Sequence, residues 1–151
     1  MKVVAQRVSE ARVFVHKRKT GEIRHGLLVF LGISREDSEA DADYLLDKLL
    51  WLRDFRDDED KMNRNIKDAG GAFLIVSQFT LYADCRRGRR PSFDRAAPPE
   101  QARALYDYFV AAARRTSVPV QSGEFQAMME VQLVNDGPVT ILLDSADRKS
   151  V

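Results

Sequence analysis

The sequence predicts an α+β fold: a single domain with a mixed or antiparallel, barrel-like β-sheet covered by two main helices. Several runs are rich in β-branched and aromatic residues, as strands are, and two longer segments carry apolar residues at helical spacing. Strand-like runs cluster before each helix instead of alternating regularly with helices, which favours an antiparallel or mixed sheet. At 151 residues, without linker or internal repeat, the chain is expected to be one domain spanning 1–151.

The N-terminal region contains the first expected strands. Lys2–Val8 alternates in polarity, which places Arg7 on a face of small apolar residues, at a sheet margin or in an interface. Ala11–Lys17 repeats the strand pattern, and Lys19–Gly21 is expected to form the turn that follows it. Glu22–Ile33 then carries an apolar run that is typical of a central strand.

The two helices are expected on either side of the chain's midpoint. Ser38–Arg53 has helical spacing, and Ser38 with Asp41 three residues later resembles a capping box. The acidic segment Asp54–Lys61 is expected to be a solvated loop. The second helix is expected to start near Pro98 and Pro99, because proline is favoured in the first turn of a helix.

The stretch Gly71–Asp84 organises the rest of the chain. The apolar run Ala72–Val76 predicts a buried strand, and polar side chains follow where that strand leaves the core. Side chains at the end of a rigid strand are well placed to form a site. The remaining strands are expected at Val118–Val120, Glu130–Val134 and Val139–Leu143, with Asn135–Thr140 as a turn between the last two.

Composition excludes several classes of protein. Hydrophobic residues make up 44% of the chain, which is typical of globular proteins, and no apolar run approaches the ~18–20 residues of a membrane span. The single cysteine, Cys85, allows no intrachain disulfide, so we expect a cytoplasmic protein. No Cys/His or carboxylate cluster indicates a metal, and no cofactor is expected. A net charge of +1 requires any nucleic-acid contact to use a local patch.

Two motifs, SQFTLYAD at 77–84 and NDGPVT at 135–140, resemble the D-aminoacyl-tRNA deacylase family, whose enzymes hydrolyse D-amino acids from mischarged tRNA. The resemblance extends over nearly the whole chain, including the KVVAQRVSEARV opening, KMNRN and GRRPSF. It implies an ester hydrolase that proofreads translation as a homodimer, with aminoacylated tRNA as the partner. It also implies that Ser77, Gln78, Phe79 and Thr80 form the ester end of the pocket.

The residues themselves leave the mechanism open. Thr80 or Ser77 could act as a nucleophile only with a base, and neither His16 nor His25 belongs to a recognisable triad. An aminoacyl ester is already activated, however, and the backbone N–H groups of Phe79 and Thr80 could stabilise its oxyanion. The alternatives are an esterase on other substrates with Thr80 as nucleophile and a non-catalytic RNA-binding module.

Turn statistics indicate that Gly137 and Pro138 are part of a hairpin turn. The family resemblance implies instead a cis Gly-Pro bond that enters the partner subunit's pocket and rejects L-amino acids by steric overlap. Such a gate would also let achiral glycine through, so glycyl-tRNA on a non-cognate tRNA is an expected substrate. Arg7 is expected to pin this turn across the dimer interface, because its five donors suit backbone carbonyls.

Two further regions are expected to bind the tRNA. By resemblance, Phe125 and Met129 line the pocket for the terminal adenosine, and Gln126 stands between them where the family has glycine. An aromatic ring and a thioether suit the stacking of a base. A basic loop holds five arginines against two aspartates, a local net charge of +3 that suits phosphate contacts. The tentative phosphate contacts are Arg86, Arg87, Arg89 and Arg90.

Overall fold

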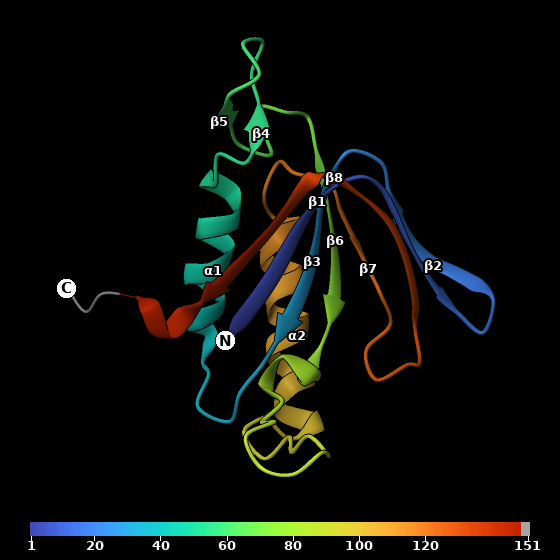
Figure 1. Cartoon of the computed structure of the whole chain (residues 1–151), viewed down its shortest axis with the longest axis vertical. Coiled ribbons are helices and arrows are strands. Elements are labelled where there is room, and N and C mark those ends of the chain that lie inside the picture. Colours follow the sequence, from blue (N-terminus) through green and yellow to red (C-terminus); the bar gives the residue numbers. More distant parts are fainter. Residues whose placement is uncertain (149–151) are drawn as a thin grey trace.

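The computed structural model describes residues 1–148, which form a single α+β domain (Figure 1). Two helices lie against a six-stranded sheet of order β2-β1-β3-β6-β7, in which β8 pairs with β1. Only the β3–β6 and β6–β7 pairs are parallel, so the sheet is mixed. The predicted fold class is confirmed. The main elements are β1 (Lys2–Val15), β2 (Arg18–Ile23), β3 (Gly26–Gly32), α1 (Glu39–Trp51), β6 (Ala72–Ser77), α2 (Pro99–Arg114), β7 (Val120–Ser122) and β8 (Glu130–Asp144).

Two hydrophobic cores lie on opposite faces of β3 and β6. Leu27, Val29 and Leu31 of β3 point into a core that both helices share, while Leu28 points into a second core inside the curled sheet. The second core is nearly enclosed because β2 approaches β7: a Cβ on Gly21 would lie 2.8 Å from the Ser122 carbonyl oxygen. Burial on both faces explains why β3 is a continuous apolar run.

The N-terminal strands differ from the prediction. Lys2–Val8 and residues 11–15 are parts of one strand, β1, whose pairing with β8 shifts register between Gln6 and Glu10. The turn lies at His16 and Lys17, with φ of +48° and +63°, so the predicted turn at Lys19–Gly21 is wrong and those residues belong to β2. The pattern misled because bulges change which side chains face the core without ending the strand.

The C-terminal strands also differ. Asn135–Thr140 does not reverse the chain: it belongs to β8, which continues from Glu130 to Asp144 along β1. Partners change from Asn135 opposite Val8 to Thr140 opposite Gln6, so the intervening residues bulge out of the ladder. The hairpin turn is therefore wrong, and the segment is a large bulge on an edge strand. The expected strand at Val118–Val120 is β7, two residues later at each end.

The helices agree with the prediction. At the start of α1 the Ser38 N–H donates to the Asp41 carboxylate at 2.8 Å, as in a capping box. Pro99 opens α2, and the Tyr106 hydroxyl of α2 donates to the Ile75 carbonyl oxygen at 2.9 Å. Because Ile75 lies in β6, that bond fastens the second helix to the strand that leads into the candidate site.

The acidic segment Asp54–Lys61 is not the solvated loop that its composition predicts. It begins with β4 (Phe55–Arg56), which pairs with β5 (Met62–Arg64) in a small hairpin, and Asp54 and Phe55 are buried. The Phe55 ring fills the main core, which draws the preceding Asp54 inside with it. Within residues 1–148, no helix is long and apolar enough to cross a membrane.

Candidate active site

The first part of the candidate site is the end of β6. Ser77 pairs with Leu31, and the Gln78 N–H donates to the Leu31 carbonyl oxygen at 2.8 Å. The chain then turns into η1 (Phe79–Tyr82), a short 3-10 helix. This turn lies so close to β3 that a Cβ on Gly32 would be 3.1 Å from the Gln78 carbonyl oxygen. Glycine on β3 thus lets the predicted ester-binding residues lie against the sheet.

The turn leaves backbone donors available. Phe79 and Thr80 begin η1, and in the part of the chain that the structure describes neither N–H has a hydrogen-bond acceptor. The first N–H groups of a helical turn lack acceptors within that turn. Both residues are exposed, with Phe79 at 58%. Two free N–H groups at an exposed strand end can bind a developing oxyanion.

No side-chain base activates a nucleophile here. The Gln78 amide donates to the Thr80 hydroxyl, which takes up a lone pair of the oxygen that would have to attack. Among the described residues, neither histidine bonds to Ser77 or Thr80: His16 lies in the β1–β2 turn and the His25 ring packs on Phe55. Burial raises the pKa of nearby Tyr82 to about 12, so its hydroxyl stays protonated. The arrangement favours catalysis by backbone donors.

The second part is the bulge at Gly137–Pro138, whose peptide bond is cis. Both residues are exposed, whereas Arg7 behind them is only 2% exposed. The Arg7 Nε–H donates to the Asp136 carbonyl oxygen at 3.1 Å and lies 3.4 Å from its carboxylate. The Asn135 amide donates to the carbonyl oxygens of Arg7 and Val139, both at 3.0 Å. The bulge therefore projects outward from a fixed base.

Arg7, which the sequence predicts to pin the turn across a dimer interface, holds the bulge of its own chain. Its Nη1 donates to the Asp54 carbonyl oxygen at 2.7 Å, so one buried guanidinium ties β1 to both the bulge and the start of β4. Gly137 packs on this group, since a Cβ there would lie 2.8 Å from Arg7 Nη2. Its φ of +127° also favours glycine.

Asp54 is an unexpected part of this cluster. Its side chain is buried, and neither carboxylate oxygen accepts a hydrogen bond from another side chain or peptide of the described residues. Burial raises the pKa of Asp54 to about 6, and the Arg7 charge only partly opposes this effect. The apolar Phe55 beside it indicates in the sequence that this segment could be buried, but the acidic residues that follow favoured a solvated loop.

The structure brings the predicted site residues together in two groups, not one. Along β3, Leu27 pairs with Arg7 at the bulge and Leu31 pairs with Ser77 at the ester end. At about 3.3 Å per strand residue, four residues separate the groups by about 13 Å. The bulge and the end of β6 therefore lie at opposite ends of the sheet, as Figure 1 shows for β6 and the middle of β8.

Phe125 and Met129 lie beside the ester end. The Phe125 ring is 5.6 Å from the Tyr106 ring, and the Arg103 guanidinium lies over it at 4.8 Å. Gln126 has φ of +63°, a left-handed conformation that favours glycine, the residue that the family resemblance implies at this position. Arg103 was missed by sequence reasoning because only the tertiary fold brings α2 beside this loop.

The basic loop is less positive than its composition suggests. Arg86 donates to both carboxylate oxygens of Asp84, which holds the pKa of that carboxyl well below its usual range. Within the described residues, Arg87, Arg89 and Arg90 take part in no ion pair, and all three are exposed. These three can therefore contact phosphates more readily than Arg86. No group of three metal-ligating side chains occurs in residues 1–148.

The fold and the site define an α+β domain whose described residues leave backbone donors free at a strand end, an arrangement that suits the hydrolysis of an activated ester. The sequence model of the D-Tyr-tRNA(Tyr) deacylase family matches residues 4–144. The D-aminoacyl-tRNA deacylase of Solibacter usitatus is 61% identical over 98% of both chains. That of Thermotoga petrophila is 55% identical over 97% of this chain and 98% of its own. This chain belongs to the D-aminoacyl-tRNA deacylase family, so the expected family and enzyme class are confirmed.

Solved structures show the same fold. That of the c-Myc DNA Unwinding Element Binding Protein is 40% identical with a TM-score of 0.90, covering 95% of this chain and 98% of its own. A probable eukaryotic D-amino acid tRNA deacylase is 18% identical with a TM-score of 0.78, over 94% and 97%. At that identity the second match supports the fold alone.

Proposed function

We propose that this protein hydrolyses the ester of D-aminoacyl-tRNA and rejects L-aminoacyl-tRNA through a gate that a second copy of the chain supplies. The observation that carries the proposal is the separation within one chain: the outward bulge at Gly137–Pro138 is about 13 Å from Ser77 along β3, too far to line its own pocket. A two-fold dimer solves this problem, because each copy's bulge can then enter the other copy's pocket.

The surface between the two groups suits such an interface. Val4 and Leu142 are neighbours across β1 and β8, and Leu142 is 77% exposed. Exposed apolar side chains on a sheet face are favourable positions for contact with another chain. Pro138, exposed on a rigid base, is the part of each copy that would reach the partner.

The pocket chemistry follows from the ester end. The Phe79 and Thr80 N–H groups would bind the ester's oxyanion, while Gln78 orients the carbonyl or ribose. The substrate's neighbouring 2′-OH assists the attack of water, so no protein nucleophile is needed. Removal of the 2′-OH should therefore abolish turnover, whereas a Thr80 nucleophile would tolerate its loss and form a trappable acyl-enzyme.

Stereoselection is steric in this proposal. Carbonyl oxygens of the gate pack against the substrate Cα and overlap an L side chain, while a D side chain points outward. Rejection of this kind ignores the identity of the D side chain, so specificity should be broad. It also admits glycine, which has no Cβ to exclude, so glycyl-tRNA mischarged on a non-cognate tRNA is a further substrate.

The decisive experiment compares D-Tyr-tRNA and L-Tyr-tRNA hydrolysis at equal enzyme concentration. Rapid loss of the D ester with the L ester intact supports the proposal, and loss of both removes the chiral gate. Loss of neither, with a folded protein, favours an RNA-binding module using the basic loop. Dilution tests the second copy: activity should fall as the dimer dissociates, and full activity of a monomer would contradict the gate in trans.

A further inference from the structure

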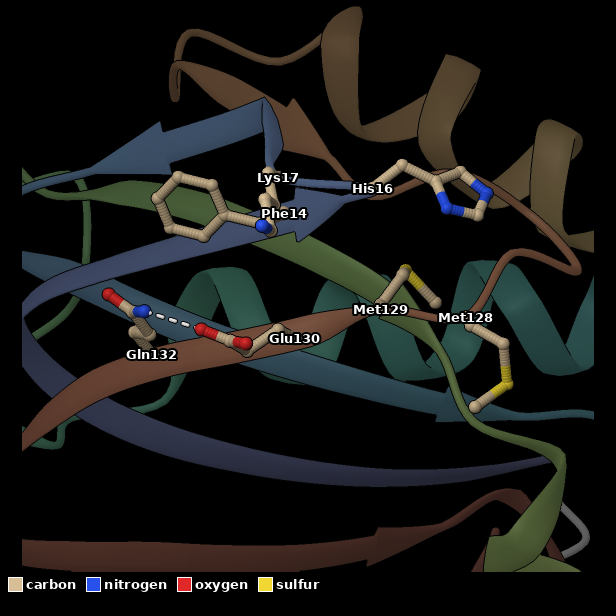
Figure 2. Close-up of a pocket in the computed structure, with 7 residues that line it drawn as sticks. All are labelled: Phe14, His16, Lys17, Met128, Met129, Glu130 and Gln132. Carbon is tan, nitrogen blue, oxygen red and sulfur yellow. Dashed lines mark hydrogen bonds between the residues drawn. The ribbon is translucent and has the colours of Figure 1, made fainter.

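A groove of about 530 Å³ lies where the β1–β2 turn faces the start of β8 (Figure 2). Such a volume is within the range of small-ligand sites. Figure 2 shows Met129 on the same side as His16, with Met128 on the adjoining loop. Besides these, the groove is lined by Phe14, Lys17, Glu130 and Gln132.

The groove continues from the ester end of the candidate site. Met129 is shared by the groove and the segment assigned above to the terminal adenosine. A Cβ on Gly123 would lie 2.7 Å from Met129 Sδ and 3.7 Å from Val76 Cγ2. Val76 directly precedes Ser77 in β6. A ligand that extends beyond Met129 and away from Ser77 would therefore enter the groove.

The lining suits a base with an attached phosphate. Met128 is 87% exposed and offers a soft surface against which a base can pack, while Phe14 lies at the opposite end of the groove beside Lys17 (Figure 2). Gln132 and Glu130, joined by a 2.6 Å hydrogen bond, place polar groups beside that surface. In the described residues Lys17 forms no ion pair, although its neighbours Arg18 and Lys19 are paired with Glu124 and Glu22.

We propose that this groove binds the penultimate nucleotide of the tRNA acceptor end, a cytidine, with its base against Met128 and a phosphate facing Lys17. The inference rests on the proposed function, because it places the terminal adenosine next to Met129. The occupant is one nucleotide of the same substrate, since the groove adjoins that pocket and its free cation suits the backbone.

The test uses minimal substrates that differ by one nucleotide: the D-tyrosyl ester of adenosine and that of the dinucleotide CpA. For the unaltered protein, kcat/KM should be about tenfold higher on the CpA ester, in line with the usual contribution of stacking to binding. The double variant Met128→Ala/Lys17→Gln should lose that advantage and keep its activity on the adenosine ester. Both side chains are exposed, so the fold should persist.

The matched control is Met62→Ala/Lys61→Gln, which removes another exposed methionine and lysine on the remote β4–β5 hairpin. It should keep the full tenfold advantage. An unaltered protein that gains nothing from the added cytidine overturns the inference. So does a Met128/Lys17 variant that loses activity equally on both esters, since the groove would then act at the ester end.

A binding measurement separates this inference from the proposed function. If neither D ester is hydrolysed by the unaltered protein, the proposed function fails, and titration with unacylated CpA and with adenosine then tests the groove alone. Binding of CpA that weakens about tenfold in the Met128/Lys17 variant, with adenosine binding unaffected, supports the nucleotide site. Equal binding of CpA by both proteins rejects it.

Discussion

The two ends of the sheet are built in opposite ways. At the end of β6, Phe79 and Thr80 are exposed and their N–H groups are free in the described chain. At the bulge of β8, a buried Arg7 binds carbonyl oxygens from two distant segments. The N–H groups at the first end remain available to a ligand, whereas the Arg7 guanidinium at the second end donates to carbonyl oxygens of its own chain. The contrast fits the proposal that the end of β6 binds the reacting group, while the contacts of Arg7 hold the shape of the bulge.

The largest effect is expected from Arg7→Met, which would remove the base of the bulge. This variant leaves the buried Asp54 without a countercharge, so stability should fall by about 3–5 kcal/mol, measured by urea unfolding. Arg7→Met/Asp54→Leu should recover most of that stability and still lose D-over-L discrimination. Recovered discrimination in the double variant would show that Arg7 is not what shapes the bulge.

At the other end, Phe79→Pro tests the backbone donors. Proline suits the first position of a helical turn, and the preceding Gln78 has φ of −145°, so the backbone should be kept while the N–H is lost. We expect kcat to fall by about 10²–10³-fold, as for removal of one oxyanion donor. Phe79→Ala is the control, because it removes the ring and retains the N–H. Equal losses in both variants would assign the effect to the ring.

Asp54→Asn tests the buried cluster at the bulge through the pH dependence of protein stability. The folded pKa of about 6 lies above the unfolded value of about 3.9, so Asp54 stabilises the fold fully below pH ~4 and this contribution disappears as pH rises through 6. Two pKa units correspond to about 3 kcal/mol. Thermal unfolding from pH 4 to 7.5 should show the unaltered protein losing stability relative to Asp54→Asn by up to that amount.

The control for Asp54 has the opposite sign. The partly exposed Asp57 carboxylate accepts hydrogen bonds from the Lys61 backbone N–H and the Asn63 amide, which lower its pKa. Its contribution to stability is present at neutral pH and is lost as pH falls. Asp57→Asn should therefore be less stable than the unaltered protein at neutral pH, and this difference in stability should shrink in acid. The same pH trend in both variants would show that Asp54 is not titrating as a buried group.

Gly137→Ala should have the smallest effect on stability and a specific effect on selectivity. The new Cβ would lie 2.8 Å from Arg7 Nη2 and 2.9 Å from Val139 Cγ2, which shifts the bulge. An L residue at this φ costs about 1–2 kcal/mol of backbone strain. Because this strain displaces the bulge, we expect the ratio of D to L hydrolysis to fall by about tenfold. Gly70→Ala also places an L residue at positive φ, +66°, but in open surroundings, so it should leave the ratio unchanged.

The sequence by itself determined the fold class, the helices and the character of the ester end. Apolar periodicity located α1 and α2, because a helix buries one stripe of side chains whatever it packs against. The motif at Ser77–Thr80 follows a buried strand, so its position at a strand end was predictable from local pattern. The family could be recognised because both motifs are contiguous in sequence.

Only the tertiary structure decided the shape of the bulge at Gly137–Pro138. Arg7, Asp54 and Asp136 are far apart along the chain, and their contacts depend on how β8 bulges over β1, which no local pattern encodes. The burial of Asp54 and the continuity of β8 through Gly137 arise for the same reason: long-range packing overrode an acidic run and a turn motif. Local sequence pattern thus specified the strand end that we propose binds the ester, whereas long-range packing specified the shape of the bulge.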